Sequence, residues 1–262
     1  MKQDAMIIAT EKKYDKVFSI CTLVTDNDEY QLMKESFVEQ GFENDSEYLV
    51  ADNIGANKFN AYEAIRQFLL QGRGQYLIIV HQDVRCDDNA EKLKAVLEEL
   101  QQQDNMWAVC GNAGASGYKQ LYYHINNNGD VRKSPGLPAR VSSLDENLLI
   151  VKNGTGLTVS ADLHDFHLYG TDLCLVADFL GYSCYVVGFM VTHLSKGNLD
   201  HLETQVPHFI SAYSHKLRDR FVQTTCTKFY LGNNKPANTV LNSAPVFFWV
   251  KAWQRLKNGL SK

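Results

Sequence analysis

The sequence predicts an α/β domain with a mostly parallel central sheet, helices on both faces of that sheet, and a helical extension at the C-terminus. Apolar, β-branched runs alternate with segments of helical periodicity from residue 17 to residue 111, as in successive strand–helix–strand units. Hydrophobic residues make up 45% of the 262 residues and charged residues 21%, which is ordinary for a globular chain. A chain of this length is able to bury a substantial core.

The first half of the chain contains four predicted strands with helices between them. The strands are expected at 17–25, 47–51, 75–80 and 106–111. Helices are predicted at 29–40 and within 56–72, because a glycine stands at the end of each periodic segment. Asp88 and Glu91 have the spacing of a capping box, which predicts that a third helix begins there.

The second half is less regular. A glycine-rich loop is expected at 111–117, and the Asn-Gly pair in "YYHINNNGDVRK" predicts a hairpin turn. A strand at 148–152, a helix that begins near Asp172, and a last strand at 185–193 follow. No repeat, low-complexity tract or linker is visible, so we expect one domain over 1–220 and an extension over 221–262.

Charge and cysteine content limit the class of protein. Residues 221–262 carry a net charge of +6 and residues 1–220 a net charge of −10. The extension is therefore expected to meet an anionic partner, whereas the remainder would repel nucleic acid. The six cysteines are widely spaced without a C-x-x-C pair, and neither a signal peptide nor a membrane-spanning stretch is visible. These features predict a reduced, soluble, cytoplasmic protein.

Polar side chains follow several predicted strands, where an open α/β sheet places its ligand crevice. They are Asp26, Asp52, Asn53, His81, Gln82, Asp83 and His193. A carboxylate such as Asp83 at a strand end is suited to hold Mg²⁺ or Mn²⁺ together with phosphate and water oxygens. An imidazole from His193 would favour Mn²⁺. The alternative is that Asp83 only begins a turn and His193 is an ordinary hydrogen-bonded histidine.

Five segments in order carry a family resemblance. They read "VADNIGANKFNAYEAI", "HQDV", "SLDENLLIVK", "DFHLYGTDLCLVADFLGY" and "THLSKG". Together, over about residues 17–215, the chain resembles the family-2-like glycosyltransferases of the GT-A fold, and most closely the bacterial branch with His-Gln-Asp in place of Asp-X-Asp. The resemblance implies an inverting transfer of sugar from a nucleotide-sugar donor, expected to be a UDP-sugar. The acceptor would be a glycan or lipid-linked glycan in bacterial surface polysaccharide synthesis.

The resemblance also implies roles for the donor-side residues. Asp52 and Asn53, together with Asp26 in the loop after the first strand, match the region that grips the donor base and ribose. Asp83 matches the carboxylate that ties the metal to the diphosphate, and His193 matches a late histidine that joins the metal. His81 and Gln82 would shape the nucleotide pocket. Because His81 replaces an aspartate of the usual motif, cation binding is expected to be weak until the donor arrives.

On the acceptor side, the resemblance places Asp145 near the transferred sugar. Asp172 falls in the region of the base that deprotonates the acceptor hydroxyl. The usual Glu-Asp pair of the family is replaced here by "GTDLC", so the base could equally be Asp165 or His167. Asp172 could also be an ordinary helix cap.

The C-terminal stretch 245–262 combines aromatic and basic residues without any acid. The apolar members are Phe247, Phe248, Trp249, Trp253 and Leu256, beside four basic residues. Such a helix suits an anionic membrane interface, which would place the protein at the inner face of the cytoplasmic membrane. It suits equally well a surface packed on the domain or on a second copy in a homodimer.

Two other functions compete with the transferase. The first is a non-catalytic module that binds a nucleotide-sugar or glycan on the same fold, although carboxylates at several strand ends would be costly to bury without a ligand. The second is a metal-dependent hydrolase or nucleotidyltransferase, which is disfavoured because the sequence shows neither a phosphate-binding lysine motif nor clustered carboxylates of the two-metal type.

Overall fold

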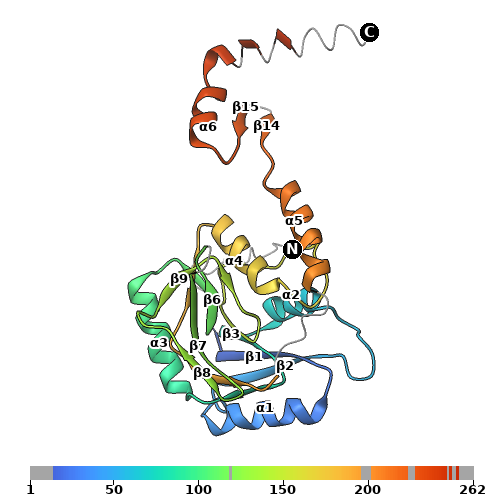
Figure 1. The fold of residues 1–262 in the computed structure, drawn as a ribbon, viewed down its shortest axis with the longest axis vertical. Coiled ribbons are helices and arrows are strands. Elements are labelled where there is room, and N and C mark those ends of the chain that lie inside the picture. The colour runs from blue at the N-terminus through green and yellow to red at the C-terminus, as the bar shows by residue number, and fades with distance from the viewer. Residues whose placement is uncertain are drawn as a thin grey trace, which may run out of the picture. The chain divides into compact units, whose positions relative to one another are not determined.

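The computed structural model describes residues 14–117, 120–195, 202–223, 228–246, 248–249 and 252–253 (Figure 1). The chain forms two compact units, Met1–Leu202 and Glu203–Lys262, which we call unit 1 and unit 2. The sequence had suggested a boundary at residue 220. No helix in the described part of the chain has both the length and the apolar character needed to cross a membrane.

Unit 1 is built around a seven-stranded sheet. In spatial order its strands are β2 (Ser46–Asp52), β1 (Lys16–Val24), β3 (Gly74–Val80), β11 (Leu148–Lys152), β5 (Trp107–Gly111), β12 (Ser183–Val186) and β9 (Ala139–Val141). Pairing is parallel between β1 and β2, between β1 and β3, and between β5 and β12. The strand β11 is antiparallel to both β3 and β5, and β9 is antiparallel to β12.

The sheet is therefore mixed, and the prediction of a mostly parallel sheet is confirmed only in part. Five strands point in one direction, while β11 and β9 oppose them. The run "LLIVK" is buried almost throughout. Such a continuous apolar run indicates a covered strand but contains no information about strand direction.

A second, six-stranded sheet lies beside the first. Its strands are β10 (Ser143–Leu144), β6 (Ala113–Ala115), β7 (Leu121–Asn127), β13 (Val191–His193), β4 (Val84–Cys86) and β8 (Asp130–Lys133). The predicted hairpin turn is confirmed between β7 and β8, where Asn128 and Gly129 have φ of 47° and 99°. Strand β6 occupies part of the predicted glycine-rich loop. Gly114 is needed in β6, because a Cβ there would clash with the carbonyl oxygen of Ser143 on β10.

The strand predicted at 185–193 is wrong as a single element. Strand β12 ends at Val186 in the seven-stranded sheet, and β13 begins at Val191 in the other sheet. The intervening bend is nearly as apolar as the two strands, and Val187 and Phe189 are fully buried in it. A hydrophobic run alone does not reveal where a chain passes from one sheet to another.

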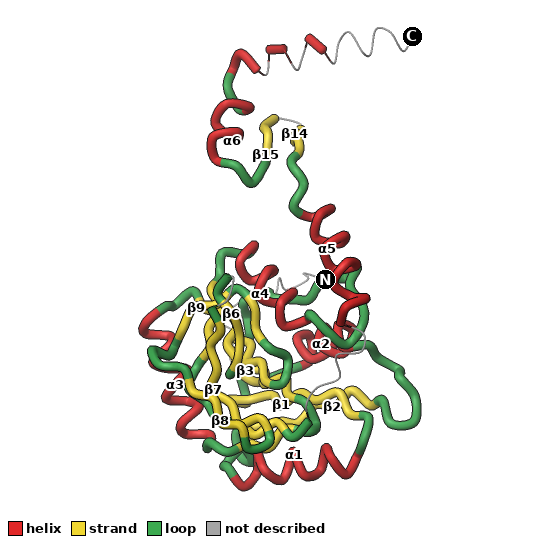
Figure 2. The backbone as a smooth tube through the Cα atoms, viewed as in Figure 1, coloured by secondary structure: helices red, strands yellow, loops and turns green. Residues whose placement is uncertain are grey.

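Helices cover both faces of the central sheet, as predicted (Figure 1). The helices in the described part of unit 1 are α1 (Asn27–Glu39), α2 (Ala61–Gln71), α3 (Ala90–Gln103) and α4 (Tyr169–Phe179). Met33 and Phe37 of α1 share one buried cluster with Leu93 and Leu97 of α3. The tube in Figure 2 shows α2 and α4 on the opposite side of the strands, where α2 contacts β1 and β3 and α4 contacts β5 and β12.

The helix starts differ from the predictions at two positions. Asn89, not Asp88, caps α3 by accepting a hydrogen bond from the Lys92 backbone. One Asp88 oxygen instead accepts from the Met190 amide at 2.6 Å, which ties the start of α3 to the chain before β13. Asp172 does not open α4, because the helix already begins at Tyr169.

Unit 2 contains helices and a hairpin. Its elements are α5 (Leu202–Lys216), β14 (Arg220–Gln223), β15 (Lys228–Leu231) and α6 (Lys235–Leu241). The strands β14 and β15 pair antiparallel, so the predicted extension is not wholly helical. Of the aromatic stretch, Phe248, Trp249 and Trp253 are described and exposed. Phe247, Leu256 and the basic residues Lys251, Arg255, Lys257 and Lys262 lie outside the described residues.

Candidate metal and donor site

The carboxyl ends of β1, β2 and β3 lie together at one edge of the sheet. Val24 at the end of β1 is in register with Asp52 at the end of β2. The Asn53 amide donates to the Val24 carbonyl at 2.8 Å. Parallel pairing therefore brings the polar residues that follow these strands to the same edge, as expected for the ligand crevice of an α/β sheet.

Gln82 ties the end of β3 to the loop after β1. Its amide oxygen accepts from the backbone amides of Thr25 and Asp26 at 2.8 and 3.1 Å. Its amide nitrogen donates to the Thr25 hydroxyl at 2.9 Å. Gln82 therefore joins the loop after β3 to the loop after β1 at this edge of the sheet.

The residues predicted to grip the donor occupy different environments. Asp26 caps α1 by accepting from the amides of Asp28 and Glu29. Asn53 is buried, and its side chain shapes the following loop by accepting from the Phe59 amide and donating to the Phe59 carbonyl.

Asp52, the last residue of β2, is accessible to solvent at the same edge of the sheet. Its carboxylate forms an ion pair with Lys58 at 2.6 Å, and both side chains are half exposed. The pair therefore offers a hydrogen-bond acceptor, the Asp52 carboxylate, and a positive charge, the Lys58 ammonium group, to a ligand that approaches from solvent.

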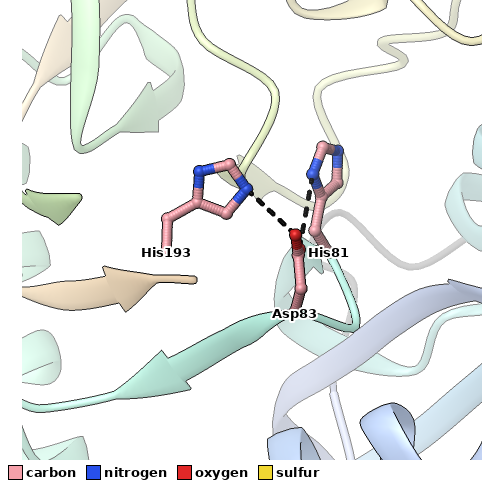
Figure 3. Close-up of side chains that lie close together, drawn as sticks. All are labelled: His81, Asp83 and His193. Carbon is pink, nitrogen blue, oxygen red and sulfur yellow. Dashed lines mark ion pairs between the residues drawn. The ribbon is translucent and has the colours of Figure 1, made fainter. Parts of the chain in front are cut away.

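His81, Asp83 and His193 form a compact cluster at this edge (Figure 3). His81 follows β3 directly, Asp83 precedes β4, and His193 ends β13. Antiparallel pairing sets His193 opposite Val84, and the Leu194 amide donates to the Asp83 carbonyl at 3.1 Å. Asp83 Oδ2 lies 3.4 Å from His193 Nε2, and Asp83 Oδ1 lies 4.0 Å from His81 Nδ1.

Hydrogen bonds determine which nitrogen of His81 carries its proton. The Tyr169 hydroxyl donates to the Glu146 carbonyl at 3.3 Å, since a carbonyl only accepts. Tyr169 must then accept the 2.8 Å hydrogen bond that it shares with His81 Nε2. The lone pair of neutral His81 is thus on Nδ1, which faces Asp83. A metal-binding histidine is typically oriented in this way, with its second nitrogen fixed by a hydrogen bond.

The charges in the cluster support an ionised carboxylate. Burial would raise the pKa of Asp83, but hydrogen bonds from His193 and Ser195 and the two nearby imidazoles hold it well below its usual range. Burial would lower the pKa of His193, but its hydrogen bond with Asp83 raises it instead. Burial also lowers the pKa of His81, which favours the neutral ring. One carboxylate oxygen and two imidazole nitrogens form a donor set that fits Mn²⁺ better than Mg²⁺.

Asp145 is held beside this cluster by buried amides. Asp145 Oδ1 accepts from the Asn147 amide at 3.1 Å and from Asn147 Nδ2 at 2.6 Å. Asn112 Nδ2 in turn donates to Asn147 Oδ1 at 3.0 Å, and both asparagines are buried. The Asp145 charge partly offsets the burial that lowers the pKa of His81, and it adds to the effect of Asp83 that raises the pKa of His193, so the structure brings this predicted residue to the site.

Glu146 and His167 form a second pair that the sequence did not predict. Glu146 Oε2 lies 3.8 Å from His167 Nδ1. Burial raises the pKa of Glu146, and the interaction with Glu146 raises the pKa of His167. The antiparallel direction of β11 sets Leu148 opposite Val80 and so carries Glu146 to the end of β3. Glu146 could have been predicted as a site residue only if the antiparallel direction of β11 had been known.

The chain around His167 adopts a strained conformation. Asp165 and Leu168 have φ of 129° and 65°, a region that L-residues rarely adopt. The Tyr62 hydroxyl donates to the His167 carbonyl at 3.1 Å and helps to hold the segment. Backbone strain of this kind concentrates at functional sites.

Asp172, the predicted base, has no exposed surface. Its two oxygens accept from the Ser160 amide at 2.7 Å and from the Ser160 hydroxyl at 2.6 Å. A carboxylate that no acceptor molecule can touch does not fit the role of base. The structure therefore disfavours Asp172 as the base, because this side chain points into the packed side of α4, where it joins α4 to the loop before it.

Comparisons with known proteins identify a relative. No protein-family model matches the sequence. A protein called ATP synthase subunits region ORF 6, from Fuscovulum blasticum, is 37% identical over 194 residues, which cover 70% of this chain and 78% of that protein. The chain belongs to the same family as that protein. The relative's name states no reaction.

A structural similarity is much weaker. The crystal structure of A197 from STIV matches with a TM-score of 0.42 and 14% identity, over 69% of this chain and 86% of that one. A similarity at this level carries no argument. The resemblance to glycosyltransferases stays a prediction.

Proposed function

We propose that the chain is a metal-dependent, inverting glycosyltransferase of GT-A type that uses a nucleotide-sugar donor, in the first instance a UDP-sugar. The cluster of His81, Asp83 and His193 carries this proposal, because it offers a cation site at the edge where three parallel strands end. The proposed acceptor is a hydroxyl of a glycan or lipid-linked glycan in bacterial surface polysaccharide synthesis, and the proposed location is the inner face of the cytoplasmic membrane.

The three cluster residues would hold Mn²⁺ or Mg²⁺. When bound, the cation would supply positive charge for the nucleotide diphosphate that leaves. The Asp52–Lys58 pair would contact the nucleoside end of the donor, since it stands accessible at the same edge. Asp145, oriented by Asn147, would accept hydrogen bonds from hydroxyls of the transferred sugar.

The Glu146–His167 pair takes the place of Asp172 as the proposed base. His167 Nδ1 faces Glu146, which leaves Nε2 to accept the proton of the attacking hydroxyl. The acceptor oxygen forms its bond to the anomeric carbon as the bond to the diphosphate oxygen breaks. The proton stays on His167, and the resulting imidazolium is stabilised by Glu146.

Binding measurements test the cation and donor assignments. Thermal unfolding would be followed with UDP-, GDP- and dTDP-sugars, each with and without Mn²⁺. We expect stabilisation by UDP-sugar that requires Mn²⁺ and is lost in Asp83→Asn. Asp130→Asn, a matched substitution on the exposed hairpin, should keep it. Mn²⁺-dependent stabilisation that survives in Asp83→Asn would contradict the site assignment.

The burial of Asp172 favours a second candidate, a non-catalytic module that binds a nucleotide-sugar or glycan. On that hypothesis the metal and donor bind, but no sugar is transferred. Release of UDP from a UDP-sugar in the presence of acceptor glycans separates the two. Release that is lost in His167→Gln while binding of the donor is retained would favour the transferase.

A further inference from the structure

The described part of unit 2 has almost no hydrophobic core of its own. Among the residues of unit 2 that the structure describes, Ala212 is the only hydrophobic residue that is buried. Many of the large apolar side chains in its helices, hairpin and aromatic stretch are exposed instead. Exposed apolar side chains in such number mark a surface that binds a partner.

The exposed large apolar residues of α5 and of the residue that follows it lie along one stripe. Val206, Ile210 and Leu217 are all exposed, and Tyr213 stands between the last two. Residues four, seven and eleven positions apart lie on the same side of a helix. The Leu217 amide bonds to the Tyr213 carbonyl, so the helical path continues to the end of the stripe. This helix face is apolar and uncovered.

The hairpin of β14 and β15 also exposes large apolar side chains. Leu231 is in register with Arg220, and Phe229 with Val222, so these four side chains share one face of the two-stranded sheet. Phe229 and Leu231 are exposed on that face. An isolated two-stranded hairpin is marginal in water without a surface to pack against.

The aromatic stretch adds two tryptophans. Trp249 and Trp253 are each 71% exposed, and the Trp249 ring lies beside that of Phe248 at 6.0 Å. Tryptophan is enriched where a membrane meets water, because its ring is apolar and its N–H remains available to a polar partner.

Charge decides between a lipid surface and a second copy of this unit. No acidic residue follows Asp219, and residues 221–262 carry a net charge of +6. Two copies joined through this surface would bring like charges together. An anionic bilayer would instead attract each lysine and arginine.

We infer that unit 2 docks on an anionic lipid bilayer. The apolar stripe of α5, the hairpin and the tryptophans enter the interface, while exposed basic side chains such as Arg220 and Lys235 contact lipid phosphates. The inferred surface extends well beyond the stretch 245–262 that the sequence singled out. It stands independently of the proposed transferase activity.

Vesicle flotation of the full chain tests the inference. We expect binding to vesicles of equal parts phosphatidylcholine and phosphatidylglycerol, and little binding to phosphatidylcholine alone. Tryptophan fluorescence should shift to the blue on binding. That shift reports Trp249 and Trp253, because Trp107, the third tryptophan, is already fully buried.

Two variants and one control sharpen the test. Trp249→Ala combined with Trp253→Ala should weaken partitioning by roughly tenfold or more, and Lys235→Gln by about fivefold. Phe179→Ala removes an equally exposed aromatic side chain, 77% exposed, from α4 of unit 1 and should leave binding unchanged. Thermal unfolding would verify that every variant is folded.

Four results would overturn the inference. They are no binding to either vesicle, equal binding to both, unchanged binding in the double tryptophan variant, and a lipid-independent dimer that the double variant abolishes. The last result would assign the surface to a second copy. Flotation needs neither donor nor metal, so each of these results leaves the proposed transfer reaction intact and removes only the proposed location at the membrane.

Discussion

Replacing Tyr169 by phenylalanine tests how His81 is oriented. The side chain is buried, and its hydroxyl links His81 Nε2 at 2.8 Å to the Glu146 carbonyl at 3.3 Å. Tyr169→Phe keeps the ring but leaves the imidazole N–H and the carbonyl without their shared partner. Burial also raises the pKa of the Tyr169 hydroxyl, so it remains a donor at neutral pH.

The magnitude follows from these two hydrogen bonds. Loss of the partner that orients a metal-binding histidine typically costs about 10- to 100-fold in metal affinity, which corresponds to about 1.4–2.8 kcal/mol. The two buried polar groups left unpaired should lower the free energy of unfolding by about 1–3 kcal/mol. We expect Mn²⁺ to bind Tyr169→Phe at least tenfold more weakly than it binds the wild type.

Titration calorimetry with Mn²⁺ at neutral pH measures the effect. Tyr62→Phe is the matched control, because Tyr62 is equally buried and its hydroxyl donates to the His167 carbonyl instead of contacting His81. Tyr62→Phe should lose stability but keep its Mn²⁺ affinity. Equal affinities in wild type and Tyr169→Phe, or equal losses in both variants, would refute the reasoning about His81.

Three further substitutions separate structural from catalytic roles. Asp172→Asn should lower the free energy of unfolding by about 2 kcal/mol in urea denaturation but leave kcat/KM of the folded enzyme unchanged. In the wild type, kcat/KM should rise with pH through the pKa of His167, which Glu146 raises, whereas His167→Gln should lose this limb and about 10²- to 10⁴-fold in rate. Burial would raise the pKa of Glu47, but hydrogen bonds from Ser19 and Arg73 lower it. Stability should therefore fall as the pH drops below about 4.5, and Glu47→Gln should lack this decline.

Each of these expectations has a result that contradicts it. A large loss of turnover in correctly folded Asp172→Asn would return the role of base to Asp172. A pH profile of unchanged shape in His167→Gln would remove His167 from the mechanism. Glu47→Gln tests the folded-state pKa alone, because Glu47 lies at the start of β2, away from the polar residues at its far end; an acid transition as steep as that of the wild type would count against the inferred shift.

Most strands and helices of the first half of the chain could be predicted from the sequence. Hydrophobic runs and helical periodicity predicted β1, β2, β3, β5 and the helices between them, because these elements bury faces that recur at fixed spacing. The glycine after α1 has φ of 85°, as expected for Gly41 at that position. The hairpin turn at Asn128 and Gly129 depended likewise on nearest neighbours alone.

The candidate site was predictable only where it depended on strand ends. Asp83 and His193 were found because each lies at the end of an apolar run. Glu146 was missed, and Asp172 was misplaced, because their positions depend on the direction of β11 and on which side of α4 is packed. The sequence pattern around a carboxylate in an apolar segment is the same whether its side chain faces a crevice or a buried serine.

The sequence by itself determined where β1, β2, β3, β5 and the helices between them form, which strand ends are polar, and that the C-terminal segment is basic and aromatic. Those properties arise from local periodicity and composition. Tertiary structure alone decided that β11 runs against its neighbours, that β13 pairs with β4, and that His81, Asp83 and His193 meet within 4.8 Å. Strand direction and sheet order arise from contacts between segments far apart in the chain, and local spacing contains no information about such contacts.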